Sequence, residues 1–335
     1  MSASSGAGIY KVLDDERING RADFFAGLDT GIDEAWSPGI ATLIQSDSEV
    51  EDYRWLGTSP MMQEWLGEAQ GQQLPNYAAY LRNVQYEATL QIQKKDIDRD
   101  KTGQIRARIA GLGQKAGRHW DKLGTDLLSN SETAGGANDG DLKDISGRAF
   151  DNQAFFDTDH SYTGSNYTSN QSNDLSSGVW DVATATAPTP DEMAKCILEA
   201  VGTIHSFRDD QGDPINAGVR NFTIVAGTVP IQSAALQAVG LENLTSGASN
   251  PLLALGNKNI TFNIVLEPRL SAKTTKLYVL GTGGDINPFI YQEEDAVSVE
   301  EEDPSIASKH IIAMAKASRA AGYGLWQKAV LGTFS

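Results

Sequence analysis

The clearest alternation of apolar and polar residues in the chain runs from Val84 to Gln93, where every second residue is apolar. Successive side chains of a β-strand point to opposite faces, so the pattern predicts a strand about 33 Å long with one apolar face. Glycine, proline and asparagine turn signals precede it in GEAQGQQLPNY. We therefore expect this strand to be one arm of a long hairpin, and its apolar face to need another surface that covers it.

A helical spacing follows directly. Apolar residues step by three or four positions through Ile105, Ile109, Leu112, Ala116, Trp120, Leu123 and Leu127. This spacing predicts an amphipathic helix over about residues 103–128, roughly 39 Å long. Gly111, Gly113 and Gly117 interrupt it, and each costs up to ~1 kcal/mol relative to alanine. Packing against the rest of the protein must therefore stabilise the helix or bend it.

A regular α+β module is predicted for residues 189–283. The run Thr189-Pro-Asp-Glu192 has a capping residue, a proline in the first turn and two acids, which together indicate a helix start. Strands are expected at 222–226, 260–266 and 276–280, and a short helix at 229–239. The preceding segment, 129–188, is rich in Gly, Ser, Thr, Asn and Asp, which is typical of loops.

The first 60 residues show little regular pattern, because glycine and acidic residues separate short apolar pieces. Such a segment buries little of its own surface and is predicted to be an arm. It nevertheless carries Trp36 and Trp55, and Trp65 follows closely. Large aromatic side chains need a surface to cover, and this surface can belong to the same chain or to a neighbour.

The overall charge narrows the classes of function. The 335 residues include 27 Lys and Arg against 44 Asp and Glu, a net charge of −17. A chain this acidic is poorly suited to bind naked nucleic acid or an anionic membrane with its whole surface. The single cysteine, Cys196, excludes an internal disulfide framework. With 40% hydrophobic residues and no secretory signal, we expect a soluble globular protein made in a reducing compartment.

One segment has the opposite charge. Residues 94–122 contain nine basic and four acidic residues, 9 − 4 = +5. The favoured interpretation is a helix whose positive face pairs with acidic segments of the same or a neighbouring subunit. The alternative is a weak surface for DNA.

Catalytic chemistry has little support. The only compact group that resembles a metal or acid–base site is Asp157, Asp159 and His160 in FFDTDH. Hydrogen bonding at a turn explains these residues better, because aspartates commonly bond nearby backbone amides there. The run GTGGD at 281–285 lacks the Gly-Lys-Ser/Thr ending of a nucleotide-binding loop. We therefore predict no catalytic residue and no cofactor, and keep the three residues as weak metal candidates.

Six segments of the chain are specific when they are taken together and in this order, although none of them is specific alone. They are WLGTSPMMQEWLGE at 55–68, YLRNVQYEATLQIQKKDIDRDKTG at 80–103, AFFDTDHSY at 154–162, RDDQGDPI at 208–215, NPLLALGNKNITFNIVLEPRL at 250–270 and GYGLWQ at 322–327. In these segments the chain resembles the gpT-like family of major head proteins of Mu-like bacteriophages. The Ser/Asn-rich insert after His160 and the acidic stretch near Glu300 depart from the family pattern.

The resemblance implies an α+β fold of the Hong Kong 97 (HK97-like) major capsid type. On that basis residues 1–60 are expected to form the N-terminal arm and 61–98 an extended hairpin, the E-loop. A peripheral (P) domain with its spine helix is expected over 99–188, an axial (A) domain over 189–283, and a return to the peripheral domain over 284–335.

The function implied by the resemblance is self-assembly into pentamers and hexamers of an icosahedral shell that encloses double-stranded DNA. Expected partners are copies of the chain itself, scaffold and portal proteins and possible decoration proteins, with weak non-specific contact to DNA and none to membranes. The expected location is the virion, after assembly in the bacterial host cytoplasm. Candidate inter-subunit contacts are Trp55, Trp65, Val84, Tyr86, Leu90 and Ile92. The alternatives are a metal-dependent hydrolase that uses the Asp/His group, or another phage structural protein of the tail or decoration type.

Overall fold

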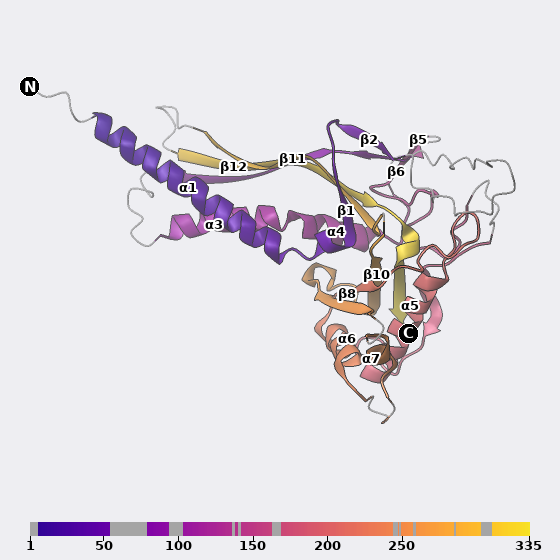
Figure 1. Ribbon diagram of the computed structural model, residues 1–335. Coiled ribbons are helices and arrows are strands. Elements are labelled where there is room, and N and C mark those ends of the chain that lie inside the picture. Colours follow the sequence, from indigo (N-terminus) through magenta and orange to yellow (C-terminus); the bar gives the residue numbers. More distant parts are fainter. Residues whose placement is uncertain are drawn as a thin grey trace, which may run out of the picture.

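The computed structural model describes residues 6–53, 79–93, 103–135, 138–139, 142–162, 169–243, 247, 249–256, 259–284, 286–302 and 310–335. Within these ranges the strands form three sheets. An elongated upper part, which contains the longest helix and the longest strands, joins a lower α+β part (Figure 1). Among the described residues, no helix combines the length and hydropathy needed to cross a bilayer.

The sheet of the upper part has four strands in the order β1, β11, β12, β4. They are β1 (Ala41–Gln45), β11 (Phe289–Glu302), β12 (His310–Tyr323) and β4 (Val84–Gln93). Two helices, α3 (Gln104–Gly117) and α4 (His119–Asn130), pack against β12, and α1 (Gly6–Glu34) runs beside α3 (Figure 1). The long strands and the helices thus lie side by side as two layers.

The predicted strand at 84–93 is confirmed, whereas the hairpin arm expected before residue 79 lies outside the described residues. β4 pairs antiparallel with β12 along its whole length, from Gln93–His310 to Val84–Arg319. A separate ladder joins β2 (Val50–Tyr53) to β3 (Ala79–Arg82), and the residues between these two strands lie outside the described ranges. Alternation of apolar residues predicts a strand with two faces, but it contains no information on which distant strand will pair with it.

The predicted helix over 103–128 is present and is divided into α3 and α4. The division falls at Arg118, whose φ of −82° and ψ of 10° leave the helical region. Gly117 comes directly before it. The apolar stripe points inward as expected, because Trp120, Leu123 and Leu127 are buried.

The expectation of an irregular arm is wrong for the first half of that segment, since α1 is a helix of 29 residues. Its buried positions pack on α3, where Phe24 and Leu28 meet Ile109 and Leu112. After α1 the chain passes through a short 3-10 turn, η1 (Ser37–Ile40), into β1. The helix is weakly patterned in sequence, so contact with α3, and not its own periodicity, determines its position.

The lower part contains a five-stranded sheet in the order β7, β13, β10, β8, β9. These strands are β7 (Asp174–Trp180), β13 (Ala329–Phe334), β10 (Lys276–Thr282), β8 (Asn221–Ala226) and β9 (Thr261–Leu266). Its helices are α5 (Pro190–Ser206), α6 (Val229–Gly240) and α7 (Pro251–Gly256). The predicted start of α5 is confirmed: Thr189 accepts from the amide of Glu192, and the Glu192 carboxylate accepts from Thr189 in return.

The end of the chain is shared between the two parts. β12 belongs to the upper sheet, whereas β13 pairs with β10 of the lower sheet. A third sheet, in the order β2, β3, β6, β5, includes β5 (Asn138–Asp139) and β6 (Leu142–Asp144). One continuous cluster of buried side chains runs through both parts, with Phe155 stacked on Tyr323 at 4.6 Å between ring centroids.

Candidate assembly surface

The apolar side of β4 holds four of the six predicted contact residues. Val84 is 46% exposed, and Tyr86, Leu90 and Ile92 are half-buried. The other two candidates, Trp55 and Trp65, lie outside the described residues. The described part of the chain therefore leaves the apolar side of β4 incompletely covered.

Aromatic and charged groups attach this strand and its neighbours to α4. The ring of Tyr86 packs edge-on against His119, with 4.5 Å between the ring centroids. The pKa of His119 is lowered to about 4, chiefly by burial and in addition by the nearby positive charges of Arg319 and Lys122. His119 is consequently neutral at physiological pH.

Arg319 of β12 is a buried charge with a specific partner. Only 2% of its side chain is exposed, and its Nη2 lies 3.0 Å from Oε1 of Glu293 on β11. Its guanidinium carbon lies 4.5 Å from the centre of the Trp120 ring on α4. Because an unpaired buried charge is costly, this arrangement holds β11, β12 and α4 in one relative position.

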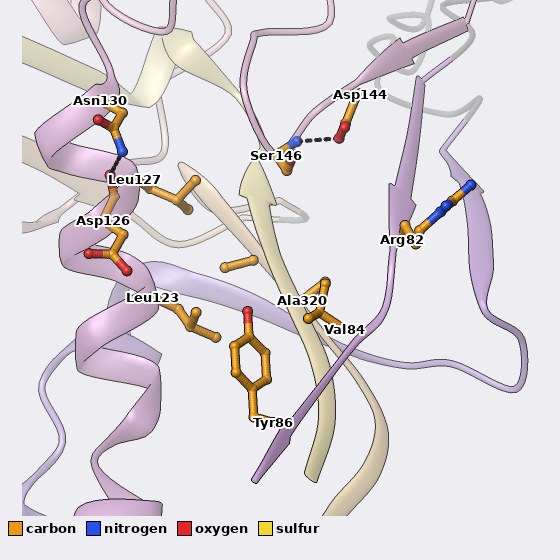
Figure 2. Close-up of a pocket in the computed structure, with 11 residues that line it drawn as sticks. Arg82, Val84, Tyr86, Leu123, Asp126, Leu127, Asn130, Asp144, Ser146 and Ala320 are labelled. Carbon is orange, nitrogen blue, oxygen red and sulfur yellow. Dashed lines mark hydrogen bonds between the residues drawn. The ribbon is translucent and has the colours of Figure 1, made fainter. Parts of the chain in front are cut away.

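A cavity of ≈ 400 Å³ opens beside the same strands (Figure 2). Its apolar wall is formed by Val84 and Tyr86 of β4, Leu123 and Leu127 of α4, and Ala320 of β12. Arg82, Asp126, Asn130, Asp144 and Ser146 supply its polar lining. This combination suits a bound peptide segment that inserts one apolar side chain into the cavity while its backbone contacts the polar lining.

The positive charges of α3 and α4 are largely neutralised within the chain. Arg106 donates to both carboxylate oxygens of Asp23 on α1, at 2.6 and 3.0 Å. Lys122 donates to Asp126 at 2.7 Å. Arg118 lies 3.8 Å from Glu34 at the end of α1. These pairs support the interpretation that the basic segment binds acidic residues of its own chain.

The side chains of Asp157, Asp159 and His160 do not converge on one point in the structure. His160 is buried and turns away from the two aspartates: its Nδ1 lies 2.6 Å from Oδ2 of Asp151, and its ring stacks on Trp326 at 4.0 Å. Asp159 bonds Asp157, and this hydrogen bond raises the pKa of Asp159. In the described parts of the chain, no three His, Cys, Asp or Glu residues are placed to hold a metal ion.

The neighbours of His160 fix the orientation of its ring. Asn173 donates through Nδ2 to the carbonyls of Phe155 and Trp326, so its Oδ1 must be an acceptor. His160 Nε2 faces that Oδ1 at 3.2 Å, while Nδ1 faces the Asp151 carboxylate. These contacts, together with the ring stacking on Trp326, tie the 151–160 turn to the C-terminal segment. Asp151 and Asn173 were not identified from sequence, because no short spacing links them to His160.

A second incompletely covered apolar surface lies at the far end of the lower part, where α6 and α7 are located (Figure 1). Val229 and Leu236 of α6 are 62% and 51% exposed, and Leu253 of α7 is 38% exposed. Neither helix contains a charged residue. On a chain with a net charge of −17, such a surface is suited to contact between like-charged copies.

This architecture, with helices under a long sheet and a separate α+β lobe, is the capsid-protein fold of Hong Kong 97 type. The procapsid of bacteriophage JBD30 superimposes with a TM-score of 0.54 and 19% identity, over 96% of this chain and 75% of that chain. The capsid of cyanophage P-SCSP1u gives a TM-score of 0.53 and 11% identity, over 90% and 88%. At such identities the likeness establishes the fold alone.

Sequence comparison finds similarity to head proteins of Mu-like phages over part of the chain. Residues 18–181 match the family model of the Mu-like prophage major head subunit gpT. The Mu-like prophage FluMu major head subunit of Haemophilus influenzae is 31% identical over 121 residues, 36% of this chain and 35% of that protein. The major capsid protein of Escherichia phage Mu is 27% identical over 140 residues, 42% of this chain and 41% of that protein. The family model thus matches just under half of this chain, and the matched parts of the two relatives span 35% and 41% of their lengths.

Proposed function

We propose that this chain is the major capsid protein of a tailed double-stranded DNA bacteriophage, and that its copies assemble into the pentamers and hexamers of an icosahedral shell. The observation that carries the proposal is the combination of a capsid-type fold with two incompletely covered apolar surfaces, on β4 and on α6–α7. A protein whose task is to pack against copies of itself keeps apolar surface available for them.

Assembly requires repeated contacts between copies and no covalent chemistry. Head-to-tail contacts between the lower α+β parts would close rings, and contacts between rings would close the shell. Burial of 1,000 Å² of apolar surface is worth up to ~25 kcal/mol before costs, and most of this is offset by association and ordering. Single contacts can then stay weak and reversible while the closed shell is stable.

The net charge of −17 suits the proposed contents. A wall that bound phosphates tightly would stop DNA from sliding during packaging, whereas a mostly repulsive wall lets it move. The intramolecular pairs of Arg106 and Lys122 support this, since they leave less positive charge for DNA. Scaffold, portal and decoration proteins are proposed partners, the virion is the proposed location, and assembly is placed in the host cytoplasm.

The proposed domain division is an N-terminal arm at 1–60, an extended hairpin at 61–98, a peripheral domain at 99–188 to which 284–335 returns, and an axial domain at 189–283. Residues 189–283 supply β8, β9 and β10 of the lower sheet together with α5 and α6, which supports the axial unit. The other two strands of that sheet, β7 and β13, come from the segments assigned to the peripheral domain. The pairing of β4 with β12 assigns Val84–Gln93 of the 61–98 segment to the upper sheet.

Negative-stain microscopy of the protein, expressed alone and with its scaffold, tests the proposal. Hollow particles of uniform diameter are expected. A monomer that stays dispersed under both conditions and at raised salt would contradict it. The hydrolase alternative predicts instead a bound metal and turnover that Asp159→Asn abolishes, and the orientation of His160 away from Asp157 and Asp159 weighs against it.

A further inference from the structure

The two edges of the upper sheet differ in how they are protected. A strand at the edge of a sheet presents unpaired backbone N–H and C=O groups, to which another strand can add. Among the described strands the order is β1, β11, β12, β4, so one edge of this sheet is β4. β1 covers β11 only from Phe289 to Glu293, so the other edge beyond that point is β11 itself.

The β11 edge has the features that prevent strand addition. The register between β11 and β12 shifts twice, between Glu293 and Asp295 and between Asp295 and Ser298. Five of the nine residues from Glu294 to Glu302 are acidic. Bulges and like charges both disfavour the approach of another strand, particularly one from an acidic chain.

The β4 edge has none of these features. Its pairing with β12 runs through ten consecutive residues without a register shift. The strand VQYEATLQIQ contains no proline, no glycine and no lysine, and Glu87 is its single charge. Among the described residues, no group outside β12 forms a backbone hydrogen bond with it. Ala88, Thr89 and Gln91 are exposed along it.

We propose that the edge of β4 facing away from β12 is a strand-addition site, at which an extended segment of a second copy of this chain continues the upper sheet. Alternate backbone amides and carbonyls of β4 would bond the added strand, and the cavity beside Val84 and Tyr86 would accept one of its apolar side chains. The inference rests on the proposed self-assembly and specifies one of its contacts.

The charges of the two sheet edges favour a second copy of this chain as the source of the added strand. Every copy carries a net charge of −17, so copies meet with least repulsion where the local charge is lowest. A cationic partner strand would find its complement at the acidic edge of β11, whereas the β4 edge offers it one carboxylate in ten residues. Contact with an identical acidic chain fits β4 better than β11.

Hydrogen exchange with mass spectrometry tests the proposal on unmodified protein. In dissociated subunits, about half of the amides of residues 84–93 should exchange rapidly, because they face away from β12. In particles, these amides should exchange at least about tenfold more slowly. Residues 294–302 provide the internal control, since their outward amides should exchange alike in both states. Equal exchange of 84–93 in subunits and particles would overturn the inference.

Proline substitution tests the backbone bonding directly. Neighbouring amides of a strand point to opposite sides, so one of Ala88→Pro and Thr89→Pro removes an amide that bonds β12, and the other removes an outward one. The outward variant should keep the subunit's melting temperature and lose about tenfold in particle yield. The same pair on β11, Ser298→Pro and Val299→Pro, is the matched control, and its outward member should assemble normally. Normal assembly by the outward β4 variant would refute strand addition.

The two proposals fail in distinguishable ways. If the unmodified chain forms no particles, the capsid function itself is contradicted, and the β4 contact with it. If particles form while 84–93 stays unprotected, only the strand-addition site is wrong.

Discussion

A β carbon added to Gly113 on α3 would lie 2.1 Å from the carbonyl oxygen of Phe24 on α1, so the two helices touch backbone to backbone at this point. Gly27 and Gly31 of α1 approach α3 as closely, at the carbonyls of Ala110 and Gln114. Glycines spaced four residues apart lie on one face of a helix, and here glycine faces on both helices allow the contact. The glycines that weaken α3 as a helix are the reason that α1 can dock on it.

Gly113→Ala should therefore release α1. A methyl group at this position overlaps backbone and not a movable side chain, and we expect a loss of about 1–3 kcal/mol in the docking of the helix. Limited proteolysis should cleave the N-terminal segment faster. Gly111→Ala is the matched control, because it lies on the same helix with no atom within 4 Å of the added carbon. Equal proteolysis rates in the two variants would contradict the prediction.

Leu90→Asp should leave folded subunits that fail to form stable particles. Leu90 is half-buried on the apolar side of β4, and a carboxylate there would have to be desolvated on assembly. Gln91→Asp adds the same charge on an exposed position of the same strand and should assemble at near wild-type yield. Sedimentation of both variants checks the prediction, and normal particles from Leu90→Asp would remove this side of β4 from the interface.

His119 should make the subunit sensitive to acid. Its pKa is about 4 in the folded chain against an ordinary value of 6.5, so the unfolded state binds the proton more tightly. The stabilisation is complete above pH 6.5 and is lost as the pH falls from there towards 4. In His119→Gln the denaturant midpoint should fall less between pH 7 and pH 4.5 than in the wild type. If the denaturant midpoint falls equally in the two proteins between pH 7 and pH 4.5, the acid sensitivity arises from other groups.

Raised salt should promote assembly in vitro. Copies with a charge of −17 repel one another, and the screening length falls from about 10 Å at 0.1 M salt to about 3 Å at 1 M. Light scattering at several NaCl concentrations should show faster particle growth at the higher ones, with equal osmolality of sucrose as the control. Assembly confined to the lowest ionic strength would show that attraction between charges, and not apolar burial, drives association.

Metal removal should not affect assembly. Asp157 and Asp159 bond each other, and His160 bonds Asp151. Treatment with a chelator, and the Asp159→Asn variant, should both leave the particle yield unchanged. Loss of particles on chelation, restored by a divalent ion, would contradict this account of the group.

Local pattern was sufficient for many individual elements. The alternation in β4, the capping box at Thr189 and Glu192, and the helix α6 were all predictable, because a strand's period and a helix cap depend on residues within a few positions. The division of the long helix near Gly117 was also foreseeable from its glycines. The similarity of the chain to Mu-like head proteins likewise resides in short ordered segments.

Tertiary structure alone decided how these elements meet. β4 pairs with β12 through Gln93 and His310, and no local period encodes a partner so distant along the chain. The position of α1 depends on the glycine faces of another helix, and the orientation of the His160 ring depends on Asp151 and Asn173. The sequence by itself determined which faces are apolar and which segments are regular, because those follow from neighbouring residues. Which apolar faces the chain buries, and which it leaves for another copy, depends on long-range packing and was decided only by the fold.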